Sequence, residues 1–245
     1  GPGATNAITG LLAAWQDSVP CLFVSGQVRS QHTSYGRKVR QVGTQEVNIC
    51  DIVRPITKYC KFVESKESFV EDLRFALEIA RSGRPGPVWL DLPLDFQWGN
   101  IPFENKLLAP KSKPAPMTNI NSANAAVSLM QRSLRPLLIL GYGIRLAGHD
   151  ALLGELIAKH NLPFVTTWTA ADLFPTDETL NLGILGMCGQ RGANQAVFQA
   201  DLLICLGTHL SIPHTTTLFD TYAPDSKKII VNIDSDQLEN LNVNF

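Results

Sequence analysis

Short apolar runs alternate with segments of helical periodicity along most of this chain. The runs are continuously apolar rather than alternating, which is typical of parallel strands that are covered on both faces. The predicted strands are Cys21–Ser25, Thr57–Val63, Val88–Leu92, Leu137–Leu140, Phe164–Thr167, Leu202–Leu206 and Ile229–Ile233.

Between the runs, apolar residues recur at helical spacing. One helix face joins Phe69, Leu73 and Leu77 and stops before Gly83. Similar faces are predicted at residues 7–15, 125–130 and 152–157. Strands that alternate with helices of this length predict an α/β architecture with parallel sheets.

A stretch rich in proline divides the pattern in two. Residues 99–118 show no sustained period and contain Pro102, Pro110, Pro114 and Pro116. We therefore predict a first domain over residues 1–100, an extended linker over 101–118 and a second domain over 119–245. The first domain has only three good strands, fewer than a complete parallel sheet usually has, so we expect it to be incomplete.

Composition narrows the function classes. Apolar residues make up 44% of the chain and charged residues 18%, as in a globular protein. The net charge of -1 lacks the basic excess of a nucleic-acid partner, and no apolar run approaches the roughly 20 residues that span a membrane. The five cysteines are scattered without C-x-x-C spacing, so we predict a reducing, cytoplasmic setting and no metal site in the chain.

The first residues carry the strongest local signal. A Gly1-Pro2-Gly3 turn leads directly into a predicted helix. Glycine at a helix start allows backbone and ligand to approach closely, because it has no Cβ. Such a turn is an abrupt place for a domain to begin, so we expect the chain to be cut from a longer protein.

Several glycines follow predicted strands. Gly141 and Gly143 form Gly-x-Gly between a strand and a helix, where a dinucleotide can dock, but the next glycine, Gly148, is not at the fingerprint spacing. A plain strand-to-helix turn is therefore the alternative interpretation. Gly207 follows another predicted strand and is expected at the same ligand-binding edge of the sheet.

Three charged positions each allow two interpretations. Asp234 follows the last predicted strand and either bonds a ribose hydroxyl or caps a helix. Arg84 lies in a rigid turn and is either a phosphate ligand or a solvated residue. The basic cluster Arg37, Lys38 and Arg40, which precedes Gln45, is either a solvated face or a site that attracts an anion.

Taken together, four segments resemble the thiamine diphosphate enzymes of the acetolactate synthase type, and they occur in the order of that family. They are GPGATNAITGLLAAWQDSVPCLFVSGQV at residues 1–28, VGTQEVNICDIVRPITKY at 42–59, SGRPGPVWLDLPLD at 82–95, and LGILGMCGQRGANQAVFQADLLICLGTHL at 182–210.

The resemblance implies a layout. Residues 1–100 look like the C-terminal part of the pyrimidine-binding domain, and residues 119–245 look like the central domain, a Rossmann-like sheet of six parallel strands. The domain that holds the cofactor diphosphate through Mg²⁺ and the glutamate that activates the aminopyrimidine are expected outside the chain. The fragment alone is therefore expected to be catalytically incomplete, and the full-length enzyme is expected to be a homodimer or homotetramer.

The same resemblance assigns residues. Pro2 and Asn6 match positions beside the aminopyrimidine ring of thiamine diphosphate, and Gln45 matches a glutamine near the reacting centre. In several family members the central domain binds FAD without redox use, whereas other members keep the fold without the flavin. The positions that would line FAD are Arg84, Gly141, Gly143, Gly207 and Asp234. The implied activity transfers a two-carbon unit from a 2-oxo acid such as pyruvate to a carbonyl acceptor.

The chain departs from the acetolactate synthase pattern around the acceptor and flavin loops, at Thr44, Leu94, His209, Ser211 and Ile212. Its loop from Arg29 to Arg40 is also longer and more basic than usual. These departures favour an alternative in which the acceptor is a keto-sugar nucleotide of surface-polysaccharide synthesis. Two further alternatives are a non-catalytic dinucleotide-binding or oligomerisation module, and an NAD-dependent oxidoreductase that uses Gly141-x-Gly143.

Overall fold

The structure, a computed structural model, describes residues 1–98, 120–215 and 221–239. The chain forms two compact units, Gly1–Ala115 and Pro116–Phe245. The predicted linker, 101–118, lies outside the described residues. Each unit is built on a parallel sheet, which confirms the predicted α/β class.

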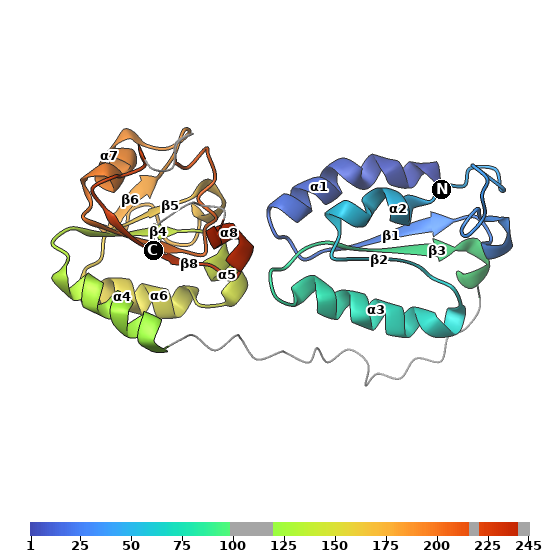
Figure 1. Cartoon of the computed structure of the whole chain (residues 1–245), viewed down its shortest axis with the longest axis horizontal. Helices are drawn as coiled ribbons and strands as arrows, with labels where there is room; N and C mark the ends of the chain where they lie inside the picture. Colours follow the sequence, from blue (N-terminus) through green and yellow to red (C-terminus); the bar gives the residue numbers. More distant parts are fainter. Residues whose placement is uncertain (99–119, 216–220, 240–245) are drawn as a thin grey trace. The chain divides into compact units, whose positions relative to one another are not determined.

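The first unit is a three-layer sandwich (Figure 1). Its sheet has the strand order β1-β3-β2, formed by Leu22–Gln27, Val88–Pro93 and Tyr59–Phe62 respectively. Helices α1 (Ile8–Gln16) and α2 (Ile49–Val53) cover one face, where they bury Trp89 of β3. Helix α3 (Lys66–Arg81) covers the opposite face and buries Val88 and Leu90.

Helix α3 shows how local sequence fixes the ends of an element. The Ser65 side chain accepts a hydrogen bond from the Ser68 amide at 3.1 Å, an N-cap that stabilises a helix by about 1 kcal/mol. At the other end, Lys58 Nζ donates to the carbonyl of Ile79 at 2.6 Å, and Gly83 follows with a φ of 54°. The ammonium thus satisfies helix carbonyls that have no partner within the helix.

The second unit contains a five-stranded parallel sheet in the order β6-β5-β4-β7-β8. Helices α4 and α6 cover one face and α7 covers the other (Figure 1). The strands β4 to β8 are Pro136–Leu140, Phe164–Thr166, Asn181–Ile184, Leu202–Leu206 and Lys227–Val231. Its helices α4, α5, α6, α7 and α8 are Ile120–Arg132, Gly143–Ala147, Asp150–His160, Arg191–Gln199 and Ser235–Glu239.

Two expectations about this sheet are wrong. Six strands were expected, and the described part of the unit has five. The strand pattern also missed β6, because Asn181–Ile184 is an edge strand that contains Gly183 at a φ of 103° and pairs irregularly with β5. Such a segment has neither the apolar run of a buried strand nor a clean alternation.

Candidate functional site

The Gly-Pro-Gly turn opens the first unit as a short 3-10 helix, Pro2–Ala7, that continues into α1. Proline suits this position because a backbone N–H in the first turn of a helix has no partner within the helix, so nothing is lost where proline lacks one. The amide of Ala4 donates to the carbonyl of Gly1 at 3.0 Å, and the Gly1 nitrogen donates to the carbonyl of Gly26 on β1. The turn is therefore fixed against the carboxyl end of the edge strand β1.

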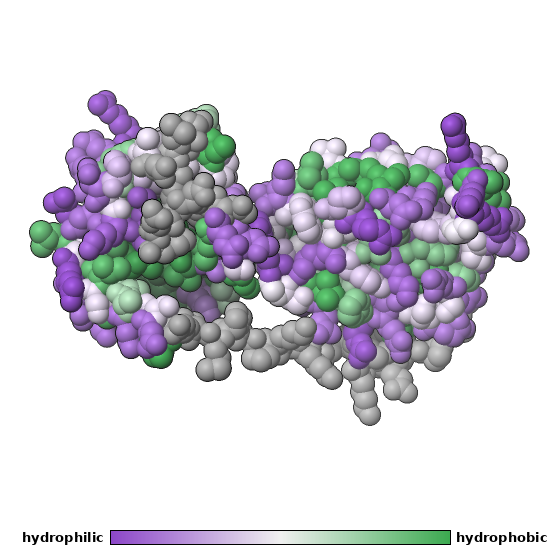
Figure 2. Space-filling view, viewed as in Figure 1, coloured by the Kyte–Doolittle hydropathy of each residue, from purple (hydrophilic) through white to green (hydrophobic). Residues whose placement is uncertain are grey.

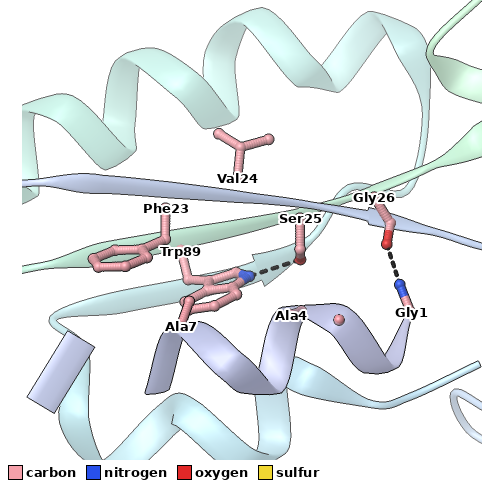
Figure 3. A pocket seen from close by; sticks show the side chains of 9 residues that line it. Gly1, Ala4, Ala7, Phe23, Val24, Ser25, Gly26 and Trp89 are labelled. Atoms are coloured by element: carbon pink, nitrogen blue, oxygen red, sulfur yellow. Dashed lines mark hydrogen bonds between the residues drawn. The ribbon is translucent and has the colours of Figure 1, made fainter. Parts of the chain in front are cut away.

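A cleft of about 430 Å³ lies between this helix and β1 (Figure 3). Phe23 and Trp89 stack there with ring centroids 5.1 Å apart and an interplanar angle of 8°. The volume falls within the roughly 300–1,000 Å³ range of small-molecule sites. The cleft is lined by Gly1, Gly3, Ala4, Ala7, Phe23, Val24, Ser25, Gly26 and Trp89.

The cleft suits a flat, mostly apolar ring. A Cβ built on Gly3 would meet no atom within 4 Å, so that side of the cleft is open. The aromatic pair supplies apolar surface, and Ser25 supplies a buried hydroxyl that accepts the Trp89 Nε1–H at 2.8 Å. Pro2 and Asn6 lie on the same 3-10 helix, but both are exposed and neither lines the cleft.

Gln45 lies beside this opening turn. A Cβ built on Gly1 would stand only 2.1 Å from the Gln45 carbonyl oxygen, so the contact requires glycine at position 1. Gln45 itself is exposed and has a φ of 61°, a left-handed conformation that costs a side-chain-bearing residue about 1–2 kcal/mol. The structure thus places Gln45 against the opening turn, whose Pro2 and Asn6 the resemblance assigns to the same cofactor site.

The next residue, Glu46, organises the basic loop. Its buried carboxylate accepts hydrogen bonds from the backbone amides of Ser34, Val42 and Gly43, the second at 2.7 Å and the third at 3.3 Å. Burial opposes ionisation, but these hydrogen bonds outweigh it and lower the pKa of Glu46 from its ordinary 4.5. The Glu46 carboxylate therefore holds together the two ends of the loop that begins at Ser34 and ends at Gly43.

The cationic residues of that loop point to solvent. Arg37, Lys38 and Arg40 are exposed, and none of them forms an ion pair with another residue in the described part of the chain. At the base of the loop, Asp95 accepts from the amide and the hydroxyl of Ser30 at 2.9 and 2.6 Å. The loop thus presents positive charge on a backbone held by two carboxylates.

In the second unit, Gly141, Gly143 and Gly207 touch one another. The Gly143 amide donates to the Gly207 carbonyl at 3.0 Å. A Cβ on Gly141 would lie 2.3 Å from the Gly207 oxygen, and Gly207 has a φ of 60°. The turns after β4 and β7 therefore approach so closely that only glycine fits, and this contact explains all three glycines without a ligand.

Asp234 begins helix α8. Its Oδ1 accepts a hydrogen bond from the Gln237 amide at 3.3 Å, which is the N-cap geometry that was the alternative to ribose binding. Nearby, Asn232 Nδ2 donates to the Thr208 carbonyl at 3.3 Å, so the loops after β7 and β8 are joined. Asp234 thus stands at the same sheet edge as Gly207.

Arg84 belongs to the first unit, whereas the other four residues of the predicted FAD set belong to the second. Arg84 Nε donates to Ser18 Oγ at 2.8 Å, in the turn that follows α1. Its assignment to a dinucleotide site stays a prediction.

The carboxyl edge of the second sheet also holds a residue that the sequence did not single out. His214 is 5% exposed, its Nδ1 lies 2.8 Å from Ser211 Oγ, and its ring packs edge-on against Trp168 at 4.7 Å. Its Nε2 is buried without a hydrogen-bond partner, and burial lowers its pKa. A lone histidine before a run of threonines gives no sequence signal for this position.

Two features are absent from the described ranges. No helix there is long and apolar enough to cross a membrane. No three His, Cys, Asp or Glu side chains in these ranges stand together as a metal ion would require. The five cysteines are free thiols, of which Cys50 and Cys205 are buried.

Comparison with known proteins assigns both units. Residues 1–52 match the model described as thiamine pyrophosphate enzyme, N-terminal TPP binding domain, and residues 123–244 match thiamine pyrophosphate enzyme, central domain.

Two curated relatives that match the chain are named as acetolactate synthase large subunits. The chain is 35% identical over 239 residues to the probable acetolactate synthase large subunit of Methanocaldococcus jannaschii, covering 96% of this chain and 39% of that protein. It is 35% identical over 241 residues to the acetolactate synthase isozyme 1 large subunit of Escherichia coli, covering 97% and 41%. The chain therefore spans about two fifths of the length of these relatives. These matches confirm the resemblance found in the sequence: the chain belongs to the thiamine pyrophosphate enzyme family.

Proposed function

We propose that the chain is part of a thiamine diphosphate-dependent decarboxylase and carboligase of the acetolactate synthase type, which transfers a two-carbon unit from a 2-oxo acid such as pyruvate to a carbonyl acceptor. The observation that carries the proposal is the contact of Gln45 with the opening turn, beside a cleft with an aromatic floor. The names of the relatives point the same way.

The chain's own residues have binding and orienting roles in this proposal. Thiamine diphosphate, when bound, supplies the electron sink for loss of carbon dioxide. Gly3 and Ala4 leave room for its aminopyrimidine ring, and Pro2 and Asn6 contact its outer edge. Gln45 donates a hydrogen bond from its amide to the substrate, which requires the exposed side chain that the strained backbone presents.

The remaining parts of the machinery belong to the full-length protein. We propose that Mg²⁺ and the activating glutamate are bound or supplied by segments outside this chain, so the 245-residue chain alone is inert. A homodimer or homotetramer in the cytoplasm is the proposed working form. Apolar side chains gather over α1 (Figure 2), and the exposed Leu12 and Trp15 of this helix offer surface for such an assembly.

We also propose a dinucleotide, with FAD as the first candidate, at the carboxyl edge of the second sheet. Gly207 and Asp234 lie at this edge, where ligands bind in open α/β sheets. The glycine contacts and the Asp234 N-cap account for those residues without a ligand, so the absorbance spectrum of the purified full-length protein is the deciding test. A flavin spectrum supports FAD, and its absence together with no measurable NADH binding leaves a site without a dinucleotide.

The main test measures turnover by the full-length protein. Purified protein is given thiamine diphosphate, Mg²⁺ and pyruvate with a panel of carbonyl acceptors, and release of carbon dioxide and the coupled product are both recorded. Activity that disappears without thiamine diphosphate supports the proposal. No turnover of any 2-oxo acid, in a protein that binds the cofactor, would favour the non-catalytic module.

The basic loop favours a second candidate function, in which the acceptor is a keto-sugar nucleotide. Arg37, Lys38 and Arg40 are exposed cations without an ion-pair partner among the described residues, and the diphosphate of a nucleotide would supply the missing charge. Changing the three to glutamine should raise the KM for such an acceptor about tenfold or more and leave the KM for pyruvate unchanged. Efficient conversion of two pyruvates to acetolactate, with no sugar nucleotide accepted, would exclude this candidate.

A further inference from the structure

Asp91 is a buried charge in the middle of an apolar strand. It lies on β3 between Leu90 and Leu92 and is 0% exposed. No Lys, Arg or His of the described ranges forms an ion pair with it. Burial raises its pKa, and hydrogen bonds from Ser25 and Gln27 oppose that effect. A carboxylate in such a place is costly unless neutral donors satisfy both of its oxygens.

Each oxygen of Asp91 does have a donor. Ser25 Oγ donates to Oδ1 at 2.6 Å, and Gln27 Nε2 donates to Oδ2 at 2.9 Å. Ser25 and Gln27 are two residues apart on β1, and Ser25 is the registry partner of Asp91, so all three side chains share one face of the sheet. One carboxylate therefore supports two separate arms of hydrogen bonds.

The first arm leads to the cleft. Ser25 Oγ, while it donates to Asp91, accepts the Trp89 indole N–H at 2.8 Å. Both Ser25 and Trp89 line the cleft (Figure 3). Because the hydroxyl proton is directed to Asp91, its oxygen is left to accept from the indole, and this fixes the ring that forms the cleft floor.

The second arm leads to Gln45. Gln27 Nε2 also donates to the carbonyl of Val47 at 2.6 Å, and Gln27 Oε1 accepts from the Val28 amide at 3.0 Å. Val47 lies two residues after Gln45, whose carbonyl contacts Gly1. The amide of Gln27 is thus oriented by three partners, and it ties the Gln45 segment to the sheet.

We propose that Asp91 is a positioning residue of the candidate site: through Ser25 it holds the cleft floor, and through Gln27 it holds the segment that carries Gln45. This inference rests on the proposed function for its meaning in catalysis. Asp91 does not line the cleft, and it acts through the two residues that it orients.

Asp91→Asn is the sharpest variant, because it keeps the shape and changes one acceptor into a donor. If the Asn oxygen accepts from Ser25, its NH₂ group faces the NH₂ group of Gln27, which must then rotate its amide and break the bond to the Val47 carbonyl. If the Asn amide turns over, its oxygen accepts from Gln27, and its NH₂ group faces the Ser25 hydroxyl, whose proton loses its acceptor. In either orientation one arm is broken, and Gln27→Met is the variant that removes the second arm alone.

Asp72 offers a matched control. It is also a buried acid of the first unit, 7% exposed, and it accepts from Lys61 Nζ at 2.9 Å. It lies on α3, on the sheet face opposite the cleft (Figure 1). Asp72→Asn therefore reports the general cost of removing a buried carboxylate.

The test has two readouts. Hydrogen exchange of the 245-residue chain without cofactor should show amides of residues 42–49 exchanging about tenfold faster in Gln27→Met, and either these amides or the Trp89 indole N–H doing so in Asp91→Asn, with no matching change in Asp72→Asn. In the full-length protein, Asp91→Asn should lower kcat about tenfold or more with 2-oxo acid and leave the KM for thiamine diphosphate within a few fold. If Asp91→Asn does not fold, Gln27→Met alone must still show the faster exchange at residues 42–49.

Equal effects of the two Asn variants, or unchanged exchange at residues 42–49 in both Asp91→Asn and Gln27→Met, would overturn the inference. If the wild-type full-length protein shows no thiamine-dependent turnover, the proposed function is wrong. The exchange experiment would still decide whether Asp91 holds the Gln45 segment.

Discussion

Different groups pack at the carboxyl ends of the strands in the two sheets. In the first unit, buried polar side chains from β1 and β3 fill the region near the edge, with Ser25, Gln27 and Asp91 in one hydrogen-bonded group beside a cleft. In the second unit, the turns after β4 and β7 meet through Gly143 and Gly207, backbone against backbone. Glycine thus leaves open space beside the cleft in one unit, at Gly3, and marks a packing contact between two turns in the other.

This difference shows that a Gly-x-Gly motif after a strand is not by itself evidence of a ligand site. A Gly-x-Gly sequence after a strand states only that a Cβ does not fit there. The structure supplies the reason, which at Gly141 is the Gly207 oxygen. Substitutions at Gly141, Gln45, Glu46 and Asp234 test this difference between the units, in decreasing order of expected effect.

Gly141→Ala should destabilise the second unit by about 3 kcal/mol, because its Cβ would stand 2.3 Å from the Gly207 oxygen and backbone must move. Urea denaturation with hydrogen exchange resolved to each unit measures this. Gly192→Ala is the control, since a Cβ there meets nothing within 4 Å and the site lies in helix α7, where alanine is favoured. Equal stability of the two variants would contradict the packing explanation.

Gln45→Ala should lower kcat/KM of the full-length protein about 100-fold, near 2.7 kcal/mol, if its side chain bonds the substrate. Gln45→Gly should lose the same activity and yet stabilise the first unit by about 0.5–1 kcal/mol, because glycine relieves the φ of 61°. Gln41→Ala, an exposed glutamine of the same loop, is the control for activity. Loss of activity in Gln41→Ala as well would point to loop disruption instead.

Glu46→Gln should destabilise the first unit by about 2 kcal/mol at neutral pH, because amide oxygens accept less strongly than the carboxylate and the NH₂ group faces backbone N–H donors. The pKa of Glu46 is lowered in the folded protein, so its stabilisation is present above its ordinary pKa of 4.5 and is lost as pH falls through the folded value. The difference between wild type and variant, followed by denaturation, should therefore shrink below about pH 4.5. A difference independent of pH would contradict this role.

Asp234→Ala should destabilise the second unit by only about 1 kcal/mol, the usual worth of an N-cap. Asp234→Asn keeps the cap and should be nearly neutral in thermal unfolding. If FAD binds at this edge, both variants should also weaken its retention during purification. Unchanged flavin content in both would leave Asp234 as a cap alone.

Much of the architecture is encoded locally. Short apolar runs gave the positions of seven of the strands, since residues adjacent in sequence determine whether both faces of a strand are buried. The last predicted strand is displaced: β8 ends at Val231, and Ile233 is 57% exposed. The edge strand β6, the short helix α2 and helix α7 were missed, although α7 does repeat at helical spacing, with Ala193 and Val197 buried on one side.

The sequence by itself therefore determined the α/β class, most strands and the family, through periodicity and the Gly-Pro-Gly and Ser-Gly-Arg-Pro-Gly-Pro segments. Only the tertiary structure decided that Gln45 lies against Gly1 and that three glycines contact one another. It also decided that Asp91 accepts hydrogen bonds from Ser25, 66 residues away in sequence, and from Gln27, 64 residues away. A charged residue inside the apolar run of β3 was the one available signal for Asp91. Its partners depend on strand register, which is set by pairing between distant segments and not by neighbouring residues.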